Sequence, residues 1–299
     1  MVRAFKVVWV KRYSIVAGVL TLGLCLTATA SYGDAGSSPA PTPTSGGVVS
    51  GDARNPFTAK AVSAYLAGRA NSVTAALYDE SSGESFLYNP TQRGATASIA
   101  KVNIVASLLY QRAKKRVALT PVEDSLAKLA IEQSDNDAAE ALWEDLGYNA
   151  GLNTLNSKLN LRQTQLNPAN IWGLEVTTPA DQLKLLKSIV LPSKLLSATN
   201  QGYIKNLMEH VISSQRFGVP AGVPSGVEVG VKNGWDVEGS NGWQINTVGY
   251  VQSKSNPYLL VVMTHDNPSE RYGIDTVSGV SKLVWGFESR LPVYQKASS

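Results

Sequence analysis

Cysteine and histidine are almost absent from this chain of 299 residues. The one cysteine, Cys25, lies near the N-terminus, so no disulfide can form within the sequence and a domain that follows has no thiol nucleophile. The two histidines, His210 and His265, lie far apart and have no cysteine or paired acids near them. We therefore expect neither a metal site nor any other cofactor.

An excess of charge is also missing once the N-terminal segment is set aside. The chain has 27 basic and 23 acidic residues, and the excess of four is held by Arg3, Lys6, Lys11 and Arg12. The remainder is neutral. Composition therefore gives no reason to expect nucleic acid or an anionic surface as a partner.

The first 30 residues have the order of a secretory signal: a basic segment, an apolar run at residues 15–26, and the small residues Ala28-Thr-Ala30. An uncleaved anchor is the alternative, but the run is only about half of the ~20 residues that a bilayer span needs. Cys25 follows the bulky Leu24, which disfavours a lipid attachment site. We predict a signal peptide at residues 1–30, a secreted protein, and a flexible Pro/Ser/Gly linker at residues 31–54.

The apolar pattern predicts strands, then helices, then strands again. A helix at 56–70 precedes strands at 73–78 and 85–88, whose turn residues Ser81-Ser-Gly83 predict a hairpin. Apolar residues at three-and-four spacing predict helices at 102–113, 138–146, 180–190 and 201–213. Residues 226–231, 243–252 and 258–264 predict strands, and 276–288 a final helix.

This order predicts an α+β fold, in which an antiparallel sheet flanked by helices is interrupted by an inserted all-helical domain. We assign residues 55–95 and 214–299 to the α/β domain and residues 96–213 to the helical domain. The cleft between the two is the expected active site.

Ser98-Ile-Ala-Lys101 is the first of three short motifs that carry chemistry. On a helix, positions i and i+3 share a face, so Lys101 is expected beside the Ser98 hydroxyl. A serine needs an adjacent base to become a nucleophile, and a lysine can be that base only if its pKa is lowered. The same spacing recurs at Ser125-Leu-Ala-Lys128, which shows that this motif alone is weak.

The other two motifs each have a structural and a functional interpretation. Ser134 and Asp137 have the spacing of a helix capping box, whereas Ser134-Asp-Asn136 can also supply a proton relay and an amide clamp. Lys232-Asn-Gly234 ends a strand, where the lysine is either a strand-end residue or a group that holds a substrate carboxylate. The glycine permits close approach of another backbone.

Together and in this order, the three motifs resemble those of the class A β-lactamase and penicillin-binding serine hydrolase superfamily. Thr177-Thr-Pro179, which resembles the start of the helix after the omega loop of that family, and Gln215-Arg216-Phe-Gly218 add to the likeness. The resemblance covers about residues 56–291 and implies a DD-peptidase/β-lactamase-like fold with a truncated omega loop.

The resemblance implies four catalytic residues. Ser98 would attack a carbonyl carbon and form an acyl-enzyme, and Lys101 would accept its proton. Ser134, assisted by Lys232, would pass a proton to the leaving nitrogen.

It also implies four substrate-binding positions. The backbone N–H groups of Ser98 and Trp235 would form the oxyanion hole, Asn136 would orient a substrate amide, and Asn233 and Gly234 would contact the substrate.

Three features depart from the family. Asn233 stands where the family has threonine or serine, and the stretch from Lys101 to Ser134 is short. The omega-loop stretch, residues 164–179, lacks the glutamate that activates the deacylating water in class A enzymes. Glu175 is its one acid and a candidate deacylation base, although its place just before Thr177 favours a bracing role, while Asn170, near the missing position, cannot be a base.

Three functions stay open. The first is a β-lactamase-like hydrolase acting on β-lactams, and the second is a peptidoglycan DD-peptidase that β-lactams trap. The third is a binding module that has lost turnover. The expected partner is a β-lactam or a peptidoglycan stem peptide, and the expected state is a monomer. A Ser-His-Asp hydrolase is rejected because the chain has no Gly-x-Ser-x-Gly elbow.

Overall fold

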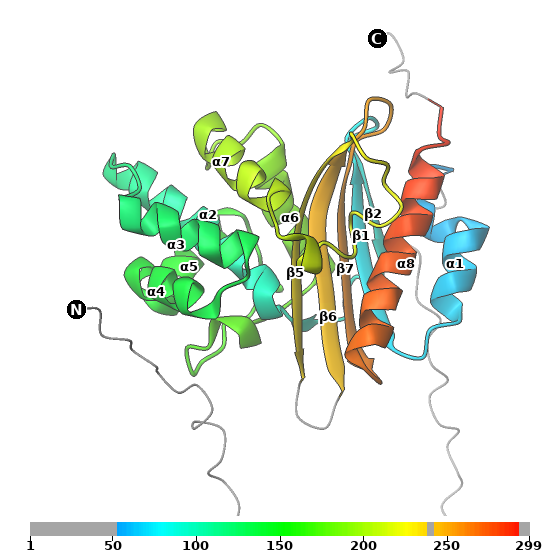
Figure 1. The fold of residues 1–299 in the computed structure, drawn as a ribbon, viewed down its shortest axis with the longest axis horizontal. Coiled ribbons are helices and arrows are strands. Elements are labelled where there is room, and N and C mark those ends of the chain that lie inside the picture. The colour runs from blue at the N-terminus through cyan, green and yellow to red at the C-terminus, as the bar shows by residue number, and fades with distance from the viewer. Residues whose placement is uncertain (1–52, 238–241, 293–299) are drawn as a thin grey trace, which may run out of the picture. The chain divides into compact units, whose positions relative to one another are not determined.

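A five-stranded antiparallel sheet organises the fold in the computed structural model, which describes residues 53–237 and 242–292 (Figure 1). The predicted signal peptide and nearly all of the predicted linker lie outside the described residues. The strand order is β2-β1-β7-β6-β5, and a small second sheet pairs β3 with β4. The strands are β1 (Ser72–Asp79), β2 (Glu84–Tyr88), β3 (Gly94–Ala95), β4 (Val176–Thr177), β5 (Glu228–Val237), β6 (Trp243–Gln252) and β7 (Tyr258–Asn267).

β1, β2 and β6 follow the predicted pattern closely, whereas β5 runs on to Val237, beyond the predicted residues 226–231, so Lys232 and Gly234 lie within the strand and not at its end. β1 and β2 pair as the expected hairpin, with Ala75 opposite Tyr88, and the Asp79 carboxylate accepts the Ser81 N–H in the turn. The middle of β7 is buried on both faces, which explains its unbroken apolar run in place of an alternating one.

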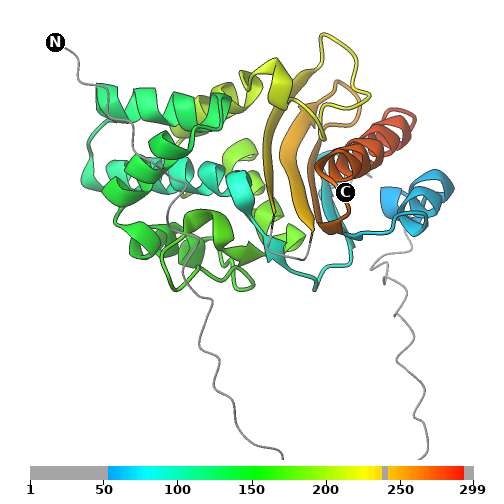
Figure 2. The same cartoon turned by 60° about the horizontal axis from the view of Figure 1, so that its bottom comes forward.

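Helices cover both faces of the sheet. Figures 1 and 2 show α1 and α8 together on one side and the remaining helices on the other. The helices are α1 (Lys60–Ala67), α2 (Ala100–Lys115), α3 (Pro121–Glu132), α4 (Asn136–Leu146), α5 (Tyr148–Lys158), α6 (Pro179–Val190), α7 (Ala198–Glu209) and α8 (Glu270–Glu288). The α+β class predicted from the sequence is confirmed, while α3 and α5 were not among the predicted helices.

Helix α6 lies against the sheet. It packs against β1 and β7 as well as against α7, and α7 packs against β5. The reason is its apolar face: Leu183, Leu186 and Ile189 are buried at a spacing that forms one stripe. Helix α6 thus covers the sheet from within residues 96–213, and the division at residue 213 stays a prediction.

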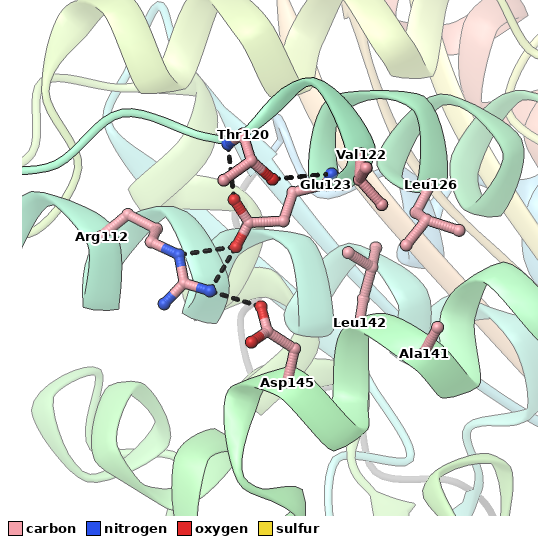
Figure 3. A pocket seen from close by; sticks show the side chains of 8 residues that line it. All are labelled: Arg112, Thr120, Val122, Glu123, Leu126, Ala141, Leu142 and Asp145. Atoms are coloured by element: carbon pink, nitrogen blue, oxygen red, sulfur yellow. Dashed lines mark hydrogen bonds and ion pairs between the residues drawn. The ribbon is translucent and has the colours of Figure 1, made fainter.

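A half-buried arginine ties three of the helices together (Figure 3). The Arg112 guanidinium, on α2, donates to Glu123 on α3 and to Asp145 on α4, beside a pocket with a largely apolar wall. Glu123 also closes a capping box with Thr120 at the start of α3. This contact fixes the orientation of α3 and α4, whose connection carries Ser134.

None of the helices within the described ranges is both long and apolar enough to span a bilayer.

Candidate active site

Ser98 lies on a 3₁₀ turn (Ala97–Ile99) that runs directly into α2. Its side chain is half-buried, whereas both neighbours in the turn are buried. Ala97 has a φ of 47°, in the left-handed region that non-glycine residues rarely adopt. This backbone, rather than a regular helix start, sets the direction of the serine.

Contacts from β6 and from the loop before α6 hold the turn in place. The amide of Asn246 donates to the carbonyls of Ala95 and Thr96, at 2.8 and 3.1 Å, and the Gln244 side chain accepts the Ala95 N–H. The Thr96 N–H donates to the carbonyl of Glu175. The segment that carries Ser98 is therefore fixed from two sides.

Lys101 is fully buried and points toward the connection between α3 and α4. Its Nζ lies 2.5 Å from the Ser134 carbonyl oxygen, 3.2 Å from Ser134 Oγ and 2.7 Å from Asn136 Oδ1. Burial lowers the pKa of Lys101 to about 7, against the opposing effect of the Asp135 carboxylate. A lysine in this state is neutral in about half of the molecules at pH 7.

The predicted contact between Lys101 and Ser98 is not a hydrogen bond in this structure. Of the hydrogen bonds among the described residues, none joins the two side chains, because the lysine uses its donors on the Ser134 carbonyl and on Asn136. Ser98 lies on the 3₁₀ turn and Lys101 in the first turn of α2, and the oxygen acceptors of Ser134 and Asn136 determine where Lys101 Nζ points.

Ser134 occupies the turn between α3 and α4 with a φ of 57°. The capping-box interpretation of Ser134 is wrong, because Asp135 caps α4 by accepting the Ala138 N–H at 2.7 Å. The Ser134 hydroxyl is thereby left for the two lysines.

Lys232, on β5, approaches Ser134 from the sheet side. Its Nζ lies 2.9 Å from Ser134 Oγ and 2.9 Å from the Asn233 carbonyl oxygen. Complete burial, and then the positive charge of Lys101, hold the pKa of Lys232 well below its ordinary value. Lys101, Ser134 and Lys232 thus form one hydrogen-bonded chain across the two halves of the fold.

Gly234 brings the β5 backbone against the Ser98 turn. A Cβ at this position would lie 2.7 Å from the Ser98 nitrogen, 2.8 Å from the Ile99 nitrogen and 2.9 Å from the Thr96 carbonyl oxygen. Only glycine permits this approach. The next residue, Trp235, is half-buried and packs its ring 6.0 Å from that of Phe217.

The structure does not place Asn233 as a donor to substrate. Its Nδ2 donates to the carbonyls of Gln215 and Phe217, at 2.7 and 2.9 Å, so both of its N–H groups are used within the protein. The side chain is buried and ties β5 to the segment before Gly218. Asn136, by contrast, is exposed at the start of α4, with its Oδ1 on Lys101.

The acid of the omega-loop stretch is buried and without a hydrogen-bond partner among the described residues. Both carboxylate oxygens of Glu175 are unpaired, and burial raises its pKa to about 8. A carboxyl that is protonated at neutral pH is a poor base. Asn170 is exposed, with a φ of 56°.

One residue beside Lys101, and the residue that holds it, were not among the predicted site residues. The Trp172 ring centroid lies 5.1 Å from Lys101 Nζ, and its Nε1 donates to Glu140 at 2.8 Å. No sequence signal separates this tryptophan from any other aromatic residue of a loop, because its partner comes from a different helix.

In the second Ser-x-x-Lys motif, Ser125 and Lys128 lie on the exposed face of α3. Ser125 is exposed and donates to the Pro121 carbonyl, and Lys128 pairs with Asp124. The His210 side chain lies within hydrogen-bond distance of the Asn206 carbonyl, and the His265 side chain within hydrogen-bond distance of Asp266. No cluster of three or more metal-ligating side chains occurs in the part of the chain that the structure describes.

Solved structures share this architecture. A β-lactamase from Xanthomonas campestris is 19% identical and superposes with a TM-score of 0.66, over 76% of this chain and 95% of its own. A class A β-lactamase from Mycobacterium abscessus is 18% identical with a TM-score of 0.64, over 75% of this chain and 96% of its own. The fold is therefore class A β-lactamase-like.

The family follows from sequence. The model of the beta-lactamase enzyme family matches residues 121–287, more than half of the chain, and the chain belongs to this family. The matched region includes Ser134 and Lys232 and begins after Ser98 and Lys101. A curated relative in Mycobacterium tuberculosis, named "Putative lipoprotein LppW", is 27% identical over 157 residues, which is half of this chain and half of that relative.

Proposed function

We propose that the protein is a serine hydrolase that opens the amide bond of β-lactams through an acyl-enzyme on Ser98. Ser98 Oγ would attack the carbonyl carbon while neutral Lys101 takes its proton. The C–N bond would then break, and the nitrogen would receive a proton through Ser134. The backbone N–H groups of Ser98 and Trp235 would bind the oxyanion.

The buried chain from Lys101 through Ser134 to Lys232 carries this proposal. A folded domain gains little from two lysines buried near one another, since burial disfavours both charges. An acyl-transfer reaction does benefit: Lys101 is already partly neutral and can accept a proton, and the Ser134 hydroxyl can pass that proton on. A binding module would have no use for this arrangement.

A peptidoglycan DD-peptidase that β-lactams trap is the second candidate, favoured by one observation. The hydrogen-bond partners of Lys101 are Ser134 and Asn136, and neither supplies a carboxylate to activate a water. An acyl-enzyme of this kind would be hydrolysed slowly. Both candidates act outside the cytoplasm, in keeping with the signal-like N-terminus and with the lipoprotein name of the mycobacterial relative.

Time-resolved mass spectrometry of the protein with a penicillin, alongside a chromogenic cephalosporin, tests the proposal. An adduct on Ser98 that turns over many times supports a β-lactamase, and an adduct that persists for hours supports the trapped peptidase. Ser98→Ala is expected to abolish the adduct, whereas the matched control Ser125→Ala is expected to leave it intact. The reverse pattern, or no adduct on the unaltered protein, would contradict the proposal.

A further inference from the structure

One aromatic side chain covers the buried lysine of the site. The Trp172 ring centroid is 5.1 Å from Lys101 Nζ, within the range of a cation–π contact. The indole is buried and begins the short 3₁₀ turn (Trp172–Leu174) of the omega-loop stretch. Lys101 therefore has hydrogen-bond acceptors on one side and the face of an aromatic ring on another.

Both the side chain and the backbone of Trp172 are held by hydrogen bonds. Its Nε1 donates to the carboxylate of Glu140 at 2.8 Å, and the Trp172 carbonyl accepts from Thr96 Oγ1 at 3.4 Å. Glu140 lies one helical turn after Asn136 on α4, so the residue that fixes the indole and the residue that bonds to Lys101 share a helix face. The ring is thus tied to α4, and the Trp172 backbone to Thr96, which directly precedes the Ser98 turn.

We propose that Trp172, fixed by Glu140, is a positioning residue that closes the approach of water to Lys101 and so prolongs the acyl-enzyme. The inference rests on the proposed function, since it concerns the fate of the acyl group on Ser98. Trp172 would act through Lys101 and the solvent rather than by touching the reacting atoms.

Deacylation needs a water molecule and a base beside it. The water oxygen must attack the acyl carbonyl carbon, give up a proton to the base, and release Ser98 as the C–Oγ bond breaks and Oγ regains a proton. Neutral Lys101 could serve as that base, because it can accept a proton. Trp172 occupies space beside its Nζ, and exclusion of water protects a reactive intermediate from hydrolysis.

Trp172→Gln and Trp172→Phe separate this role from a general loss of structure. The Gln side chain is smaller and polar, cannot act as a base, and leaves room for water; Phe keeps an apolar cover. With a penicillin as the probe, we expect the deacylation rate to rise about tenfold in Trp172→Gln. This increase is a part of the roughly 10²–10⁴-fold acceleration that general base catalysis supplies. Trp172→Phe keeps an apolar cover but loses the N–H that donates to Glu140, so its deacylation rate should rise, as in Glu140→Leu, but by less than in Trp172→Gln. A damaged fold lowers the acylation rate and does not speed deacylation.

A pair of variants at Glu140 tests the anchor. Glu140→Gln keeps an oxygen that accepts the indole N–H, so the deacylation rate should stay unchanged. Glu140→Leu removes this acceptor, so the deacylation rate should rise, as it does in Trp172→Gln. Slow deacylation in Glu140→Gln would make Glu140 the base and overturn the inference. Equal deacylation rates in all four variants and the unaltered protein would also overturn it. Failure of the unaltered protein to form an adduct would instead contradict the proposed function.

Discussion

Asn136→Asp offers a direct test of Lys101 as the base. Asn136 Oδ1 lies 2.7 Å from Lys101 Nζ, and aspartate has the same shape with one negative charge more. Asn136 is exposed at the start of α4, so the substitution should not disturb the fold. The one intended change is a carboxylate within hydrogen-bond distance of the lysine.

The magnitude follows from the pKa of the lysine. Burial lowers the pKa of Lys101 to about 7, and an adjacent opposite charge typically shifts a pKa by about 1–3 units toward the charged form. The pKa of Lys101 in Asn136→Asp is therefore expected at roughly 8–10. At pH 7 the neutral fraction would fall from about one half to between about 10% and 0.1%, and the acylation rate would fall with it.

The assay is the rate of covalent labelling by a fluorescent penicillin between pH 6 and 9.5. The unaltered protein should label faster as pH rises, with a midpoint near 7, and the midpoint should move to higher pH in Asn136→Asp. Asn136→Ala is the control, because it removes the same amide without adding charge. It can lower the maximal labelling rate, but the midpoint of the pH profile should stay near that of the unaltered protein. A midpoint that is the same in all three proteins would refute Lys101 as the titrating base.

Three further predictions concern other residues. Lys101→Arg should not label, because arginine stays protonated in proteins; near-normal labelling would exclude Lys101 as base. Gly234→Ala should nearly abolish labelling and lower the melting temperature, since the added Cβ would lie 2.7 Å from the Ser98 nitrogen, a backbone atom that cannot move aside; labelling at the unaltered rate would contradict the close approach. Glu288 is buried on α8, and burial, then the Asp79 carboxylate, raise its pKa to about 8. The fold favours the protonated form of Glu288, and this stabilisation is present at low pH and is lost as pH rises through about 8. Melting temperatures between pH 5 and 9 should therefore fall less steeply in Glu288→Gln than in the unaltered protein.

The sheet could be predicted because its signals are local. Turn residues and apolar runs in neighbouring segments identify β1, β2 and β6 with little ambiguity, and the class of fold follows from the order of elements. The position of α6 could not be predicted in this way. Its apolar stripe shows that one face is buried, but not whether the partner is a sheet or another helix.

The residues of the site were easier to find than their contacts. Motif spacing named Ser98, Lys101, Ser134 and Lys232, and the structure brings the last three into one hydrogen-bonded chain. Motif spacing says nothing about acceptors that arrive from another element. The Ser134 carbonyl decides the direction of Lys101, and two carbonyls from the segment before Gly218 occupy the amide of Asn233.

The left-handed backbone at Ala97 and Ser134 has a consequence for how this protein can evolve. Left-handed conformations at non-glycine residues disfavour folding by about 1–2 kcal/mol each, against a total stability of roughly 5–15 kcal/mol for a typical domain. Glycine at either position would relieve the strain, but at residue 134 it would remove the relay hydroxyl, and at residue 97 it would loosen the turn that aims Ser98. Selection for heat resistance alone would therefore favour changes that erode the site, and selection for activity leaves the lineage a narrower margin for mutations elsewhere.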